Sequence, residues 1–170
     1  AAEQIDAICD TVREILPRKD NAFSVIQAEL SKCGIKHLNL TALTEEEYHY
    51  LRRYFESEIL PLVSPQIIDK HHPFPFLKNK EIYVGVHIEN KGESVKIGIV
   101  PASGMFKRVV YVPSTTEVKF VLAEDLICFF ADRIFRNCKI LDKTIFRITR
   151  NADVTVEEGL YDHDIDYRTI

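Results

Sequence analysis

The sequence contains no tryptophan, a single methionine and only six glycines among 170 residues. Its four cysteines, Cys9, Cys33, Cys128 and Cys138, are far apart and form no C-x-x-C pair, so they indicate neither a zinc site nor a disulfide framework. No apolar run approaches the roughly 20 residues of a membrane-spanning helix, and no signal segment opens the chain. We therefore expect reduced thiols, no transmembrane segment and a cytoplasmic location.

The chain also lacks a basic excess. It has 22 Lys and Arg against 26 Asp and Glu, a net charge of −4, which gives no global electrostatic reason to expect a nucleic-acid partner. Hydrophobic residues make up 46% and charged residues 28%, the composition of a folded globular protein. The length suits one ordinary domain, or one domain with a short helical appendage. Because the first residue is alanine, we expect the chain to be a piece of a longer polypeptide.

Common catalytic signatures are missing as well. The sequence has no phosphate loop of the form G-x-x-x-x-G-K-[ST], no G-x-G-x-x-G, no G-x-S-x-G and no H-E-x-x-H. His71 and His72 are neighbours without a third ligand nearby, so no metal site is predicted. A small hydrolase that uses His72 with Asp69 is a weak alternative, because a proline-rich stretch gives these residues no fixed triad geometry.

Apolar spacing predicts two helices before residue 35. Apolar residues recur at three- and four-residue steps from Gln4 to Leu16, and Pro17 to Asp20 is expected to end that helix. The same spacing resumes at Phe23 and predicts a second helix. Gly34 is positioned as its C-terminal stop, because glycine tolerates the left-handed backbone that ends many helices.

A capping box predicts a third helix. Thr44 and Glu47 have the spacing at which hydroxyl and carboxylate each accept a hydrogen bond from a free backbone N–H, so the helix begins there. It is expected to run to about Leu60 and to end before Pro61. Prolines then recur through residues 61–77, which predicts an extended, irregular segment between a helical and a β-rich half.

The second half reads as strands with one helix. Residues 82–88 and 95–99 alternate between apolar and polar or small side chains, which predicts a β-hairpin. The other expected elements are strands at 107–112 and 118–121, a helix at 124–135, and a strand pair at 139–141 and 144–149. The fold class is therefore α+β: N-terminal helices followed by a mixed, mainly antiparallel sheet with one or two packed helices.

Charge is segregated along the chain. Residues 107–150 carry nine basic and five acidic groups, a net of +4, whereas both flanking segments are acidic. Such a segment can attract a polyanion, because lysine and arginine neutralise phosphates individually. An ordinary mixed surface is the alternative. The basic residues concerned are Lys107, Arg108, Lys119, Arg133, Arg136, Lys139, Lys143, Arg147 and Arg150.

Arg147 and Arg150 are candidates for two arginines that together bind a phosphate group. Three residues apart on a strand, their side chains point to opposite faces, so they converge only if the chain bends near Thr149. We favour structural pairing instead, for example of Arg150 with Asp153, or of Arg147 with an acidic group on the 124–135 helix.

Several passages together carry a resemblance to a known family. Residues 61–69 and 72–79 resemble the P-L-[TS]-P-x-x-[IV]-D…H-P-F-P-x-L-x-N passage of polyphosphate kinases of the first type. Three later passages resemble that family's motifs in the same order: Val100-Pro101 with Arg108 (V-P…R), residues 122–127 (L-x-[ED]-x-[IL]-I) and residues 146–153 (F-R-x-T-R-[ND]-A-D). The motif positions that we single out are Asp69, His72, Pro73, Phe74, Pro75, Asn79, Asn151 and Asp153.

The resemblance implies a domain organisation and a parent reaction. Residues 1–60 would end a helical N-terminal domain, 61–155 would form an α+β head or middle domain, and 156–170 would start the following segment. Members of the family transfer the γ-phosphate of ATP reversibly to inorganic polyphosphate, with Mg²⁺, through a phosphohistidine in their C-terminal domains. The H-x-K-x-x-x-x-D context of that histidine and the N-terminal S-N-L-D-E-F motif are absent here. We therefore assign no catalytic, nucleotide-binding or cofactor-binding residue to this chain, and expect it to be inactive alone.

Partners follow from the same resemblance. They are the catalytic C-terminal domains of the same polypeptide and a second subunit, since the family's head domain contributes to a dimer interface. Polyphosphate is a candidate for contact with Arg108, Arg147 and Arg150. Membrane association of the parent stands beside the cytoplasmic location as an alternative. A free-standing dimerisation or polyanion-binding module is the rival interpretation. The segment from His72 to Phe76 is interpreted as a docking surface or an inter-domain brace, with a buried crossing as the alternative.

Overall fold

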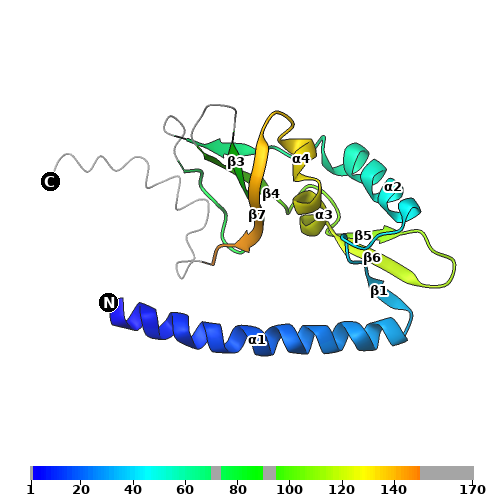
Figure 1. The fold of residues 1–170 in the computed structure, drawn as a ribbon, viewed down its shortest axis with the longest axis horizontal. Coiled ribbons are helices and arrows are strands. Elements are labelled where there is room, and N and C mark those ends of the chain that lie inside the picture. Colours follow the sequence, from blue (N-terminus) through cyan, green and yellow to red (C-terminus); the bar gives the residue numbers. More distant parts are fainter. Residues whose placement is uncertain (1, 70–73, 90–94, 150–170) are drawn as a thin grey trace.

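The computed structural model describes residues 2–69, 74–89 and 95–149. Within them the chain forms an α+β fold, as predicted, with one long helix followed by strands and short helices (Figure 1). The helices are α1 (Ala2–Lys32), α2 (Glu45–Tyr54), the π-helical turn η1 (Phe55–Ile59), α3 (Ala123–Phe129) and α4 (Ala131–Ile134). The strands are β1 (Ile35–His37), β2 (Gln66–Ile68), β3 (Ile82–Glu89), β4 (Lys96–Pro101), β5 (Val109–Val112), β6 (Val118–Leu122) and β7 (Lys139–Arg147).

The prediction of two helices before residue 35 is wrong, because α1 continues through Pro17 as one helix of 31 residues. A proline deprives the helix of one N–H donor and crowds the carbonyl four residues earlier, but it adopts a helical φ without strain. Residues on both sides of Pro17 have helical spacing, and α1 is exposed along most of its length, so nothing else competes for this segment. The predicted stop is confirmed: Gly34 has a φ of 76°, and its N–H donates to the Ser31 carbonyl oxygen at 3.1 Å.

The capping box at α2 is confirmed. The Glu47 N–H donates to Thr44 Oγ1 at 3.2 Å, and the Thr44 N–H donates to Glu47 Oε2 at 3.0 Å. The helix then widens into η1, where the Leu60 N–H donates to the Phe55 carbonyl oxygen, five residues back, at 2.8 Å. The sequence pattern did not predict this wider turn.

The strands form two sheets. The predicted hairpin, β3 with β4, is confirmed and lies within a four-stranded antiparallel sheet of order β2-β4-β3-β7. A three-stranded sheet of order β1-β6-β5 holds the strands predicted at 107–112 and 118–121, which are β5 and β6 in antiparallel pairing. The short strand β1 joins β6 in parallel, which makes the overall arrangement mixed, as expected.

Two further elements, in the second half of the chain, differ from the prediction. The region expected to hold two short strands is the single strand β7, which pairs with β3 along its length and has an irregularity in register opposite His87 and Ile88. Asp142 and Lys143, which lie between the two predicted strands, are exposed on β7 at the border of the sheet, where polar side chains are tolerated. The helix expected at 124–135 is divided into α3 and α4 at Phe130, whose φ and ψ of −93° and 25° are not helical.

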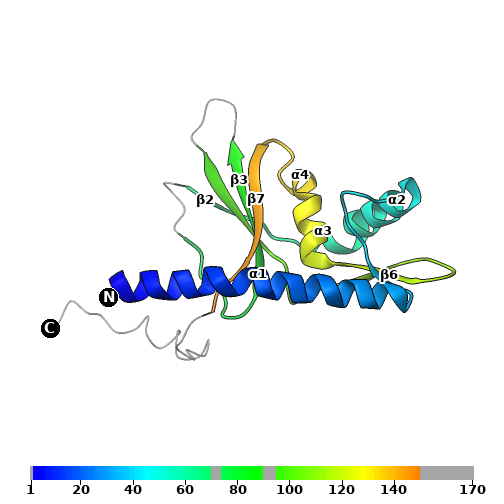
Figure 2. The same ribbon diagram turned by 60° about the horizontal axis from the view of Figure 1, so that its bottom comes forward.

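The main core lies between α3 and the four-stranded sheet and extends to α2 and η1 (Figure 2). Its fully buried members include Phe55 and Ile59 from η1, Val84 from β3, and Leu126 and Ile127 from α3. The pairs Phe55–Phe130 and Phe129–Phe130 place ring centroids 5.1 and 4.9 Å apart. The helical segment at 45–59 therefore folds into the same core as the β-rich half.

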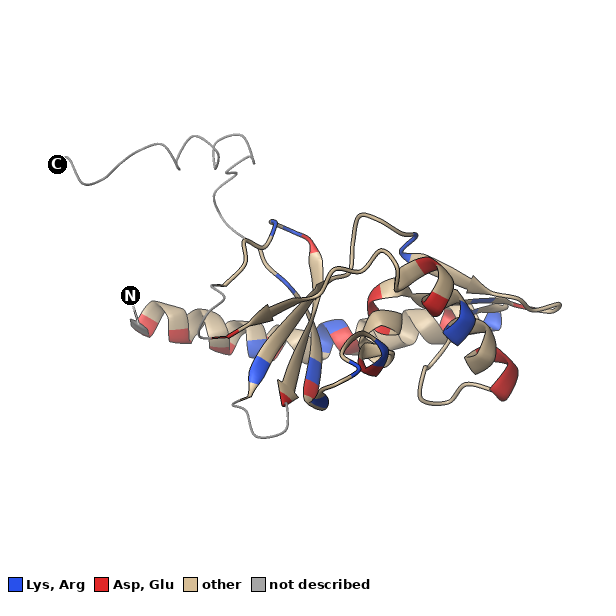
Figure 3. Cartoon of the chain, turned by 90° about the horizontal axis from the view of Figure 1, so that it is seen from above, with Lys and Arg blue, Asp and Glu red and all other residues tan. Residues whose placement is uncertain are grey.

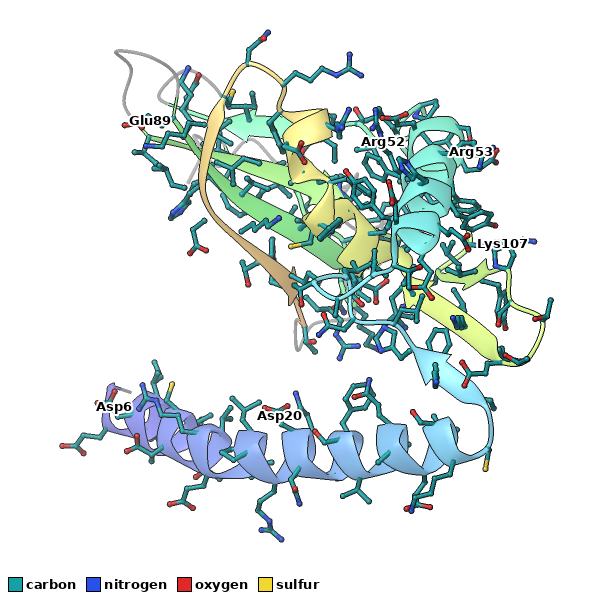
Figure 4. All side chains as sticks on the ribbon, turned by 45° about the vertical axis from the view of Figure 1, so that its right-hand side comes forward. Asp6, Asp20, Arg52, Arg53, Glu89 and Lys107 are labelled. Carbon is teal, nitrogen blue, oxygen red and sulfur yellow. The ribbon has the colours of Figure 1, made fainter. Side chains whose placement is uncertain are left out.

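Helix α1 stands apart from that core. Figures 1 and 4 show it running as a long rod that meets the rest of the chain at its C-terminal end, where it leads into β1. Its large apolar side chains are exposed, and these are Ile5, Ile8, Val12, Ile15, Leu16, Phe23, Val25, Ile26 and Leu30. No helix in the described residues combines the length and the apolar character needed to cross a membrane.

Candidate functional site

The predicted polyanion-binding segment does not form an uncompensated basic face in the described part of the chain. Four of its cations are held by carboxylates: Arg108 by Glu124, Lys119 by Glu47, Arg133 by Glu56 and Lys139 by Glu89. Figure 3 shows Lys and Arg interspersed with Asp and Glu over the helices and strands. The positive charge of residues 107–150 is therefore neutralised locally in several places.

Arg108 occupies a structural position. Its Nε and Nη2 both donate to Glu124 Oε1, at 2.8 and 2.6 Å, and the Glu124 side chain is 5% exposed while that of Arg108 is 61% exposed. The hydrogen bonds that the guanidinium donates to Glu124 raise its pKa above the ordinary value. The other oxygen of Glu124, Oε2, is buried and has no hydrogen-bond partner within the described residues. Arg108 and Glu124 belong to two different passages that resemble the family's motifs, and in the structure they form one ion pair.

Lys119 is held in a similar way. Its Nζ lies 2.8 Å from Glu47 Oε1, across 72 residues of sequence, so the capping carboxylate of α2 also binds the three-stranded sheet. The Lys119 hydrogen bond and the Thr44 N–H hold the pKa of Glu47 below its ordinary value. This carboxylate is ionised at neutral pH, and its role is structural.

The other predicted contact residues are less constrained. Arg147 ends β7 opposite Ile82 and is exposed. We predicted that Arg147 pairs with an acidic group on the 124–135 helix. Glu124, on that helix, instead accepts hydrogen bonds from Arg108. Arg150 and its predicted partner Asp153 lie outside the described residues.

The motif residues fall in two groups. Asp69 Oδ2 lies 3.8 Å from Lys96 Nζ, which links the end of β2 to the start of β4. Phe74 is 63% exposed, Pro75 is half-buried, and Asn79 lies in the turn before β3, where the Lys80 N–H donates to the Ile148 carbonyl oxygen at 2.8 Å. The remaining motif positions lie outside the described residues, and these are His72, Pro73, Asn151 and Asp153. Since His72 is among them, the alternative in which His72 acts with Asp69 stays a prediction.

An apolar slot of about 300 Å³ lies on the outer face of the four-stranded sheet. Gly85 forms its floor between Ile99 on β4 and Thr144 on β7, and Phe74 and Phe146 stand at its sides. The aromatic side chains of the described part of the 72–76 segment lie at the surface, since Phe74 is 63% and Phe76 71% exposed. The structure thus favours a surface position for these two aromatic residues over a buried one.

A second cleft, of about 630 Å³, was not predicted. We call it the His37 cleft, because Gln27 of α1, His37 of β1, Asp125 and Phe129 of α3, and Lys143 of β7 meet there. Parallel pairing of β1 with β6 brings His37 beside α3, across nearly ninety residues of sequence. No motif in the sequence could have identified this site, because its residues come together only through the tertiary fold.

Hydrogen bonds in the His37 cleft connect three elements. Gln27 Nε2 lies 3.0 Å from His37 Nδ1, and His37 Nε2 lies 3.5 Å from Asp125 Oδ2. The His37 ring stacks on Phe120 with centroids 4.9 Å apart and planes 7° from parallel. Burial raises the pKa of the Asp125 carboxyl, an effect that His37 partly opposes. Burial likewise raises the pKa of the Cys128 thiol, which also lines the cleft.

A resident metal has no evident place in the described part of the chain. No group of three or more His, Cys, Asp or Glu side chains there is arranged to hold an ion. The Mg²⁺ implied for the parent polypeptide stays a prediction.

The described residues thus form an α+β domain built on two sheets. Comparison with known proteins places it in a family. The chain matches the model of the polyphosphate kinase middle domain over residues 46–168. It belongs to the polyphosphate kinase family, as the resemblance of its motifs implied.

Individual relatives agree with this assignment. The chain is 33% identical to a polyphosphate kinase of Bacillus anthracis over 169 residues, which is 94% of this chain and 24% of the relative. It is 37% identical to a polyphosphate kinase of Bacillus cereus over 136 residues, or 76% of this chain and 19% of the relative. The chain thus spans about a quarter of the length of the curated relatives it matches.

A solved structure shows the same fold. The crystal structure of polyphosphate kinase from Porphyromonas gingivalis superposes with a TM-score of 0.74 at 22% sequence identity. The match covers 91% of this chain and 26% of that one.

Proposed function

We propose that this chain is the non-catalytic middle-domain part of a polyphosphate kinase. The longer parent polypeptide transfers the γ-phosphate of ATP reversibly to inorganic polyphosphate, with Mg²⁺, through a phosphohistidine outside residues 1–170. The observation that carries the proposal is the match of residues 46–168 to the middle domain, together with relatives about four times as long. A division between a helical N-terminal part and the α+β domain belongs to the same proposal. The sequence placed this division near residue 60, but residues 45–59 pack into the core of the β-rich half, so we place it before Glu45.

The contacts of the described residues support an architectural role. Arg108 with Glu124 and Lys119 with Glu47 are ion pairs that fasten strands to helices. Phosphoryl transfer needs clustered cations beside an activated nucleophile, and in these pairs the cations are committed to carboxylates. The domain then holds neighbouring parts of the parent in position.

The experiment compares the 170-residue chain with the longer polypeptide at equal molar concentration. Both are incubated with ATP labelled at the γ-phosphate, Mg²⁺ and short-chain polyphosphate. We expect labelled polymer and a labelled protein band from the longer polypeptide, and neither from the 170-residue chain. Turnover or labelling by the 170-residue chain would overturn the proposal.

Polyphosphate binding and self-association are separate parts of the proposal. Arg147 and Lys107 are exposed and offer charge to a polymer, so titration with long-chain polyphosphate at two salt concentrations tests contact directly. Salt-sensitive binding would favour the rival function, a free-standing polyanion-binding module, only if the longer polypeptide were also inactive. Light scattering after size-exclusion chromatography measures whether the chain forms dimers.

A further inference from the structure

The His37 cleft has an uneven balance of charge. Its charged or titratable lining residues are His37, Asp125, Cys128 and Lys143. Asp125 faces His37 at 3.5 Å, so the carboxylate has a partner inside the cleft. Lys143 differs, because no carboxylate of the described residues lies within ion-pair distance of its ammonium group. The charge left for a ligand is therefore positive.

The position of Lys143 is defined. Its Nζ donates to the Phe129 carbonyl oxygen at 3.3 Å, at the C-terminal end of α3. This single long hydrogen bond leaves two of the three ammonium hydrogens for other acceptors. The ammonium group of Lys143 is therefore held in a defined position on the side of the cleft that β7 forms.

The other walls are largely apolar. Leu38 and Leu40 follow β1, Phe129 contributes an aromatic ring, and Ile145 lies two residues beyond Lys143 on the same side of the strand. The cleft volume of about 630 Å³ falls within the range of small-molecule sites. A few convergent polar groups in a mainly apolar cleft are typical of a ligand-binding site.

We propose that the His37 cleft binds a small amphipathic anion, with its acidic group on Lys143 and its apolar body against Phe129, Leu40 and Ile145. Phosphate and carboxylate groups share the required acceptor oxygens and negative charge. The size of the cleft admits a mononucleotide or a medium-chain carboxylate. The site is separate from the chemistry proposed for the parent kinase.

Binding there has a structural consequence. Gln27 is the contribution of α1 to the cleft, and its amide touches His37. A ligand in contact with Gln27 joins α1 to β7 and α3, which otherwise contact α1 little. Occupancy therefore restrains the angle at which α1 leaves the domain (Figure 4).

The test follows methyl resonances of Leu40 and Ile145 by NMR in the full 170-residue chain. The probes are adenosine 5′-monophosphate and octanoate, which distinguish an aromatic from an aliphatic body. Adenosine and inorganic phosphate are the controls that lack the anion or the body. We expect saturable shifts with at least one probe, at a Kd of about 0.1–1 mM, and much weaker shifts with both controls.

Two variants locate the binding. Lys143→Met removes the cation at an exposed position and should weaken binding about tenfold or more, whereas Lys139→Met removes a lysine on the same strand that pairs with Glu89 outside the cleft. The Lys139→Met variant should bind like the unmodified chain. The proposal is overturned if neither probe shifts the two methyl groups at concentrations up to ~10 mM. It is equally overturned if Lys143→Met binds as tightly as the unmodified chain, since binding then occurs elsewhere, for example on the exposed stripe of α1.

Discussion

Arg108 places two guanidinium nitrogens on a single oxygen of Glu124, at 2.8 and 2.6 Å, and the second oxygen of that buried carboxylate has no partner among the described residues. The backbone of Arg108 contacts the same helix, because the Ala123 N–H donates to the Arg108 carbonyl oxygen at 2.8 Å. Backbone and side chain of Arg108 therefore both bind the first turn of α3. A buried carboxylate depends strongly on the one cation that reaches it.

Replacing Arg108 should therefore destabilise the fold. Arg108→Met leaves Glu124 buried and unpaired, at a cost of about 1–3 kcal/mol in the free energy of unfolding. Urea denaturation followed by circular dichroism measures this loss. The double variant Arg108→Met with Glu124→Met should recover much of it, because an apolar pair needs no partner. Lys107→Met, at the exposed neighbouring position, is the matched control. Equal stability of Arg108→Met and Lys107→Met would contradict the structural role.

Gly98 should not tolerate a side chain. It lies on β4 beneath the ring of Phe135, and a Cβ at this position would come within 2.5 Å of Phe135 Cζ. Phe135 is 5% exposed and has little room to move. Gly98→Ala should cost about 1–3 kcal/mol through overpacking. Gly85→Ala, where the nearest atom would lie at 3.2 Å, should cost less, and urea midpoints of the two variants test the order. The reverse order would mean that the ring above Gly98 shifts freely.

The ion pair between Glu47 and Lys119 should make stability depend on acid. The pKa of Glu47 is lower in the folded chain than in the unfolded chain, where it is about 4.3. Its contribution is therefore present above about pH 4.3 and is lost as the pH falls through the lower, folded value. Glu47→Gln should lower the Tm by about 2–4 °C at pH 7, and this difference should shrink in acid. Glu46→Gln, exposed in the same turn, is the control. A difference that is constant from pH 7 to pH 3 would rule out the charge as its cause.

The sequence predicted those features that depend on local chemistry. The capping box at Thr44, the stop at Gly34 and the hairpin of β3 with β4 each rest on residues close together in the chain. It missed β1, because three residues become a strand only through pairing with β6, more than eighty positions later.

The same limit applies to the candidate sites. The motif resemblance identified Arg108 and the passage that contains Glu124, but not that they pair across 16 residues. His37 and Lys143 belong to no motif, so spacing along the chain carried no information about their cleft. The prediction divided β7 into two strands at Asp142 and Lys143. These residues are polar because the border of the sheet is exposed, and exposed strand positions and turns favour the same residue types.

Pro17 should be the weak point of α1. It interrupts the hydrogen-bond ladder of a helix whose apolar residues are exposed on either side, such as Leu16 at 45% and Phe23 at 53%. In a helix interior proline is about 3 kcal/mol less favourable than alanine, and α1 has few tertiary contacts to offset this cost. Pro17→Ala should therefore raise the helical signal at 222 nm and slow amide hydrogen exchange in residues around position 17.

Arg18→Ala, at the next position of the same helix, controls for the gain of an alanine as such, because arginine and alanine have similar helix propensities. It should leave both measurements nearly unchanged. If Pro17→Ala left amide exchange of the surrounding residues as it was, the helix would already be fully formed across the proline, and its stability would have to come from contacts that α1 makes outside the described residues.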